Sequence, residues 1–93
     1  MTELEELRRR LDETDRALVR AFEERMELSL RVAECKRAAA LPVRDAAREE
    51  QVLSSRAAML TDARWADQTR ALYRTLMALS REAQEKSLGE ERT

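Results

Sequence analysis

The stretch CKRAAALPVRDAAREE, residues 35–50, determines how this chain divides into helices. Pro42 cannot donate a backbone hydrogen bond and it restricts the residue before it. It therefore ends a helical pattern that runs without a break over about residues 3–39. Asp45 is a favourable N-cap residue for a second helix, with the acidic Glu49 near its start. The stretch thus predicts a corner between two helices.

The segment before this corner carries apolar residues at three- and four-residue steps, the spacing of one helix face. Thr2 is a favourable N-cap, and three glutamates follow it in the first turn. A helix of about 36 residues is about 54 Å long, whereas a compact domain of this length is only ~30–35 Å across. The helix must therefore project beyond its own partner helices. Its apolar stripe continues along the projection: Leu4, Leu7, Leu11, Leu18, Phe22, Leu28 and Val32.

The segment after the corner predicts two further helices, at about 46–60 and 64–87, and a frayed polar tail at 88–93 that contains Gly89. With one glycine, one proline and no strand-like alternation, the chain is expected to be a single all-α domain over residues 1–93. We expect a three-helix protomer with one very long N-terminal helix. A second copy is the simplest cover for the projecting stripe, so the expected assembly is an intertwined homodimer.

Composition narrows the classes of function. The chain has 18 basic and 19 acidic residues mixed along its length, which argues against nucleic-acid binding. No apolar run reaches the ~18 residues that span a bilayer, and no signal-peptide pattern is present. A cytoplasmic protein without membrane contact is expected. A single cysteine excludes an internal disulfide, and the absence of histidine excludes the usual nucleophile pairs and predicts no metal site.

Two basic residues fall inside the apolar stripe of the first helix. Arg25 and Lys36 are eleven residues apart, so they lie within roughly 20° of each other around the helix and about 16 Å apart along it. Arg8 lies on the shoulder of the stripe, over 25 Å from Arg25. A buried charge without a partner costs several kcal/mol. These side chains therefore need an anionic partner, a wet cavity, or stems long enough to reach solvent. The anionic partner would be a structural glutamate across a dimer or a ligand.

The other two helices add polar groups to the same interior. Arg48 and Glu49 lie one turn before the inward-facing Val52, and Ser80 and Gln84 continue the apolar line of the third helix. Cations, a carboxylate, a hydroxyl and an amide are thus directed to one place. This composition suits a small polyanion with more than one carboxylate.

Five motifs, taken in order, resemble the all-helical class of chorismate mutases of the shikimate pathway. They are LRRRLDETD at 7–15, RMEL at 25–28, CK at 35–36, LPVRDAAREE at 41–50 and SREAQ at 80–84. The resemblance covers about residues 4–86. It implies an isomerase of aromatic amino acid biosynthesis that rearranges chorismate to prephenate, without a cofactor, in an intertwined dimer with two active sites. An activating partner enzyme is compatible with it.

The resemblance also implies a role for each matching residue. Arg8 would enter the partner's site and bind a substrate carboxylate, and Arg25 would bind a carboxylate within its own protomer. Lys36 would contact a carboxylate and the ether oxygen of the breaking bond, to which Gln84 would also donate.

The remaining matches line the other end of the implied site. Asp45, Arg48 and Glu49 would lie at the ring hydroxyl, with Glu49 accepting its hydrogen bond. Ser80, which matches the SxxxQ motif of the third helix together with Gln84, would bind substrate.

Two alternatives stay open. Isochorismate-pyruvate lyases and aminodeoxychorismate mutases share the scaffold, the arginines and the lysine, although VRDAARE at 43–49 looks like the mutase version. A non-enzymatic helical dimerisation module fits the composition alone. It gives no reason, however, for charged side chains on apolar helix faces.

Overall fold

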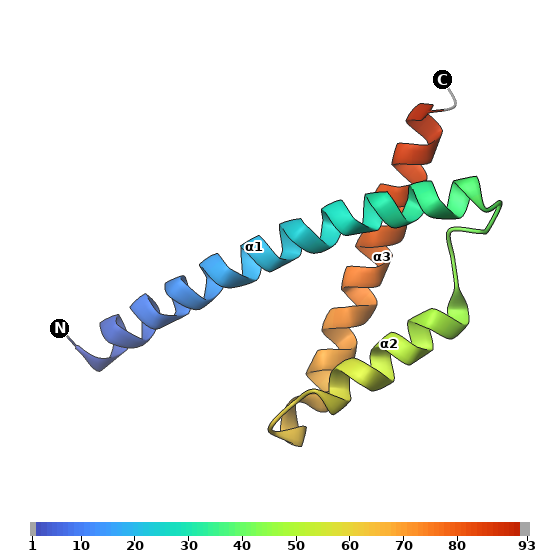
Figure 1. The fold of residues 1–93 in the computed structure, drawn as a ribbon. Helices are drawn as coiled ribbons and strands as arrows, with labels where there is room; N and C mark the ends of the chain where they lie inside the picture. The colour runs from blue at the N-terminus through green and yellow to red at the C-terminus, as the bar shows by residue number, and fades with distance from the viewer. Residues whose placement is uncertain (1, 92–93) are drawn as a thin grey trace.

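The computed structural model describes residues 2–91, and every regular element in this range is helical (Figure 1). The all-α prediction is therefore confirmed for the described part of the chain. None of its helices is both long enough and apolar enough to cross a membrane. The elements are α1 (Glu3–Ala38), α2 (Ala46–Ala58), the short 3-10 helix η1 (Ala63–Trp65) and α3 (Ala66–Glu91).

Helix α1 has the length that its sequence pattern predicts. It contains 36 residues and begins with a capping box, in which the Thr2 hydroxyl accepts from the Glu5 N–H and the Glu5 carboxylate accepts from the Thr2 N–H. The molecule is 55 Å long in its largest dimension and has a radius of gyration of 16.8 Å. A compact chain of this size has a radius near 12 Å. The long helix therefore sets the overall shape.

The corner after α1 closes through a Schellman motif. The N–H of Leu41 donates to the carbonyl of Lys36 at 2.8 Å, and the N–H of Ala40 donates to the carbonyl of Arg37 at 3.1 Å. This geometry places Ala40 in the left-handed region, with φ of 55°. The helix thus ends at Ala38, before it reaches Pro42, and a residue other than glycine occupies the position that most favours glycine.

Replacing Ala40 with glycine is expected to raise the free energy of unfolding by about 0.5–1 kcal/mol. The left-handed conformation costs an L-residue about 1–2 kcal/mol, and the greater flexibility of glycine in the unfolded chain offsets part of that gain. Urea unfolding at one fixed protein concentration measures the change. Ala38→Gly, in the last turn of the helix, is the matched control and is expected to lower stability by up to about 1 kcal/mol. A variant at Ala40 that is no more stable than the wild type would contradict the assignment.

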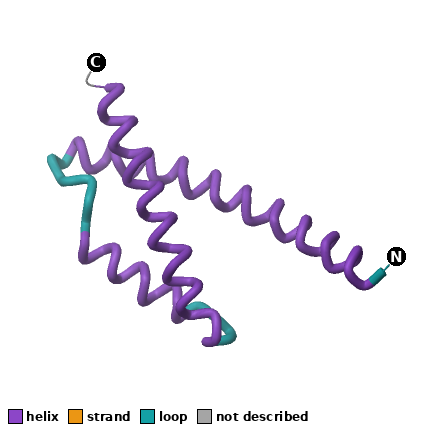
Figure 2. The backbone as a smooth tube through the Cα atoms, turned by 180° about the vertical axis from the view of Figure 1, so that it is seen from behind, coloured by secondary structure: helices purple, strands orange, loops and turns teal. Residues whose placement is uncertain are grey.

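Helix α3 packs against both α1 and α2 and connects them (Figures 1 and 2). It crosses α1 near the C-terminal end of that helix and runs beside α2. Val52 and Leu53 of α2 pack on Met77 of α3, and Tyr73 lies against this cluster. From α1, only Ser29 and Ala33 are buried. The core of one chain is small, and it lies where the three helices meet.

The N-terminal half of α1 projects past the other helices (Figures 1 and 2). Its apolar side chains are exposed in the single chain: Leu11 is 60 % exposed and Leu18 is 57 % exposed. An apolar stripe of this length on a projecting helix is a surface of the kind that association covers. The intertwined homodimer stays a prediction.

The third helix extends past its expected end. Instead of stopping near residue 87, α3 continues through Gly89 to Glu91, so the expectation of a frayed tail from residue 88 is wrong for residues 88–91. Gly89 keeps a negative φ and costs the helix only about 1 kcal/mol, while the apolar Leu88 is buried. Residues 92 and 93 of the expected tail lie outside the described residues.

Candidate active site

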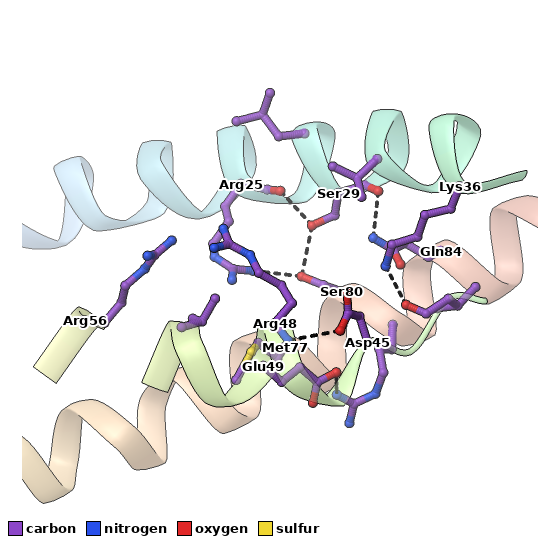
Figure 3. Close-up of a pocket in the computed structure, with 15 residues that line it drawn as sticks. Arg25, Ser29, Lys36, Asp45, Arg48, Glu49, Arg56, Met77, Ser80 and Gln84 are labelled. Atoms are coloured by element: carbon purple, nitrogen blue, oxygen red, sulfur yellow. Dashed lines mark hydrogen bonds and ion pairs between the residues drawn. The ribbon is translucent and has the colours of Figure 1, made fainter. Parts of the chain in front are cut away.

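A pocket of about 310 Å³ lies between α1, α2 and α3 (Figure 3). Seven of the eight side chains that the sequence assigns to a site line it, and they come from all three helices and the α1–α2 turn. These are Arg25, Lys36, Asp45, Arg48, Glu49, Ser80 and Gln84. The apolar part of the lining includes Leu28, Val32, Val43, Val52 and Met77.

Arg25 is held in place by two serines. Its Nη1 donates to Ser80 Oγ at 2.9 Å, and Ser29 Oγ donates to the backbone carbonyl of Arg25 at 2.9 Å. The two serine oxygens share a hydrogen bond of 3.0 Å. Since Ser29 has one hydroxyl proton and the carbonyl takes it, Ser80 supplies the proton between the serines. The hydroxyl of Ser80 therefore orients Arg25 in this state of the pocket.

Gln84 and Lys36 are each anchored to a backbone carbonyl. Gln84 is buried, and its Nε2 donates to the carbonyl of Ser29 at 2.9 Å. Lys36 Nζ donates to the carbonyl of Val43 at 2.5 Å, which ties the end of α1 to the turn. An amide nitrogen has two donor hydrogens and an ammonium has three. Each side chain therefore keeps donor capacity beyond its structural hydrogen bond, and both residues line the same pocket.

The two acids of the pocket have structural partners. Asp45 caps α2, because its Oδ1 accepts from the Arg48 N–H at 3.0 Å. Glu49 Oε2 accepts from Arg81 Nη1 at 2.6 Å, an ion pair between α2 and α3. The guanidinium of Arg48 donates to the side chain of Gln51. Within the described part of the chain, no three Asp, Glu, Cys or His side chains gather as a metal site requires.

Positive charge dominates the lining. Five cationic side chains face two carboxylates, and the cations are Arg25, Lys36, Arg48, Arg56 and Arg81. Burial lowers the pKa of Arg25, and the nearby guanidiniums of Arg56 and Arg48 lower it further, against an opposing effect of Tyr73. Arginine nevertheless stays charged at neutral pH. The pocket therefore holds cations that a bound anion would stabilise.

Arg25 and Arg56 also contact the same aromatic ring. Their guanidinium carbons lie 5.7 Å and 5.9 Å from the centroid of Tyr73. A cation over an aromatic face gains about 0.5–2 kcal/mol. Tyr73 therefore helps to keep two like charges at one end of the pocket.

Three polar lining residues were not among those predicted from the sequence: Ser29, Arg56 and Arg81. Helical spacing could have identified each one. Ser29 lies four residues after Arg25, and Arg56 lies eight residues after Arg48 on the same face of α2. Arg81 lies three residues before Gln84. Their contacts, in contrast, depend on how the helices cross.

Arg8 is the one predicted site residue that the structure does not bring to this pocket. It lies exposed on the projecting half of α1. It precedes Arg25 by seventeen residues, so the two residues are about 25 Å apart along the helix. The side chain cannot reach the pocket of its own chain.

Comparison with known proteins gives one match. A family model described as Chorismate mutase type II matches residues 7–85, which include every predicted site residue. The chain has no match among curated proteins and none among solved structures.

Proposed function

This chain belongs to the chorismate mutase type II family, and on that premise we propose that its pocket rearranges chorismate to prephenate. The observation that supports the proposal most is the lining of one pocket of about 310 Å³ by cations from all three helices, beside a buried amide and two carboxylates. Chorismate carries two carboxylates, an ether oxygen and a ring hydroxyl. Each of these groups has a complementary side chain in the pocket.

The proposed reaction requires no acid, base or nucleophile. In this Claisen rearrangement of a single substrate, one C–O bond breaks as one C–C bond forms, and no proton is transferred. An enzyme can lower the barrier by holding the substrate in its reactive shape and by stabilising charge that develops on the ether oxygen. A chain without histidine is well suited to such chemistry.

Arg25 is the residue best prepared to hold the substrate. Its hydrogen bond to Ser80 and its position over Tyr73 fix the guanidinium before any ligand binds. A guanidinium in a fixed orientation can clamp a carboxylate through two parallel hydrogen bonds. The second guanidinium would be that of Arg8 from a partner chain. Two clamped carboxylates would keep the enolpyruvyl arm over the ring.

Lys36 and Gln84 would stabilise the ether oxygen. Both are anchored through one hydrogen bond and keep further N–H groups for a ligand. By analogy with oxyanion donors, each contact contributes about 3 kcal/mol. Together they would supply a large part of the ~8 kcal/mol that a millionfold acceleration requires. At the other end of the pocket, Glu49 would accept a hydrogen bond from the ring hydroxyl, and Asp45 would lie beside it.

We also propose that two copies form an intertwined homodimer in which Arg8 completes the partner's pocket. Leu11 and Leu18 lie exposed on the same projecting half of α1 as Arg8, so covering this stripe with a second copy would carry Arg8 to another chain. Sedimentation equilibrium tests the assembly. A monomer at micromolar concentration would refute it.

A chorismate assay tests the proposed activity. Loss of the ultraviolet absorbance of chorismate, with formation of prephenate, is the expected result. Salicylate formed from isochorismate would identify a lyase instead, and conversion of aminodeoxychorismate in preference to chorismate would identify the other mutase. No turnover of any of the three would favour a dimerisation module. We propose that this activity serves aromatic amino acid biosynthesis in the cytoplasm.

A further inference from the structure

Arg81 has no part in the proposed function, yet it lines the pocket and holds one of its acids. Its Nη1 lies 2.6 Å from Glu49 Oε2, in an ion pair that joins α3 to α2. The two side chains are partly buried, at 27 % and 21 % exposure. An ion pair at this depth is screened less by solvent than one on the surface. Arg81 therefore offsets much of the charge of Glu49 where a ligand would meet it.

The charges of the pocket determine which ligand group can face this pair. The carboxylates of a doubly anionic ligand are attracted by Arg25 and Lys36 and repelled by the acids. Its hydroxyl is the group that can approach Glu49. A carboxylate has two oxygens with about four acceptor sites, so Glu49 can bind Arg81 and still accept from a hydroxyl. The Glu49–Arg81 pair thus offers an acceptor with little net charge.

We infer that Arg81 is a specificity-determining residue, which makes the pocket select a neutral hydroxyl over an ammonium at the ring position that faces Glu49. This inference rests on the proposed function. An ammonium there would lose its water and meet a carboxylate whose charge Arg81 largely offsets, with Arg48 and Arg81 as like charges nearby. A hydroxyl avoids this repulsion. Without Arg81, the free charge of Glu49 would attract the ammonium.

The test compares chorismate with 4-amino-4-deoxychorismate, which carries an ammonium in place of the ring hydroxyl. The readout is the ratio of kcat/KM for the two substrates in the wild type and in Arg81→Met. We expect the preference for chorismate to fall at least about tenfold in the variant. Arg81→Lys should keep the preference, because it keeps the charge. Arg74→Met, an exposed position on the same helix, should leave the ratio unchanged.

Glu49→Gln provides the reciprocal test, and it serves also if Arg81→Met does not fold. This variant removes the attractive charge and keeps Arg81, so the preference for chorismate should rise. A purely structural ion pair predicts lower stability in both variants and no change in the ratio. A ratio that stays at the wild-type value in folded, active variants overturns the inference and leaves the proposed function intact. Wild-type protein that does not turn over chorismate refutes the proposed function itself.

Discussion

Replacing Lys36 with alanine is expected to reduce kcat/KM for chorismate by about a thousandfold or more. The ammonium lines the same pocket as Gln84, and each of the four arginines in that lining is held by another partner. Loss of one donor to a developing oxyanion costs about 3 kcal/mol, and loss of a charged contact to a carboxylate adds to that cost. Steady-state kinetics with chorismate measures the effect.

The chain offers a matched control for this experiment. Lys86 is its other lysine, exposed near the end of α3 and outside the pocket. Lys86→Ala is expected to keep wild-type activity. Far-ultraviolet circular dichroism and the assembly state should be the same for both variants, because Lys36 makes one hydrogen bond to the turn and caps no helix. Near wild-type kinetics in Lys36→Ala would remove this residue from the site and, with it, the proposed mechanism.

Arg8→Ala is expected to be nearly inactive, although Arg8 is about 25 Å from the pocket of its own chain. The physical reason is that the projecting half of α1 would deliver this guanidinium to the pocket of the partner chain. The decisive measurement mixes two inactive variants. Co-refolding Arg8→Ala with Lys36→Ala should restore about a quarter of wild-type activity. Random pairing makes half of the dimers mixed, and each mixed dimer has one intact site of two.

Two controls accompany the mixing experiment. Arg20→Ala changes an exposed arginine on the opposite side of α1 from the apolar stripe, and it should keep activity. Refolding either inactive variant alone should restore nothing. Full activity of Arg8→Ala, or no recovery in the mixture of two folded dimeric variants, would show that the pocket is complete within one chain.

The sequence predicts those parts of the fold that depend on neighbours along the chain. The start of α1 follows from Thr2 and its capping box, and the start of α2 follows from Asp45. Helical periodicity placed Arg25 and Lys36 on one face, and both line the pocket. The end of α3 differs from the predicted one, because Gly89 signals a terminus locally whereas the buried Leu88 favours continuation of the helix.

The contacts between helices cannot be predicted from neighbours along the chain. The bonds from Gln84 to Ser29 and from Arg25 to Ser80 join residues 55 positions apart, and Arg81 reaches Glu49 across 32. Periodicity shows which face of a helix a residue occupies. It does not show which residue of another helix lies opposite, because that depends on the crossing of the two helices.

The sequence alone determined the helices, the long projection of α1 and the presence of cations on apolar faces, because capping, periodicity and the rise per residue are local properties. Only the tertiary structure decided that Arg56 lies over Tyr73, that Ser80 orients Arg25, and that Glu49 is paired with Arg81. These features arise where α3 packs against α1 and α2. The packing of whole helix faces, which sums many small contacts, sets that geometry.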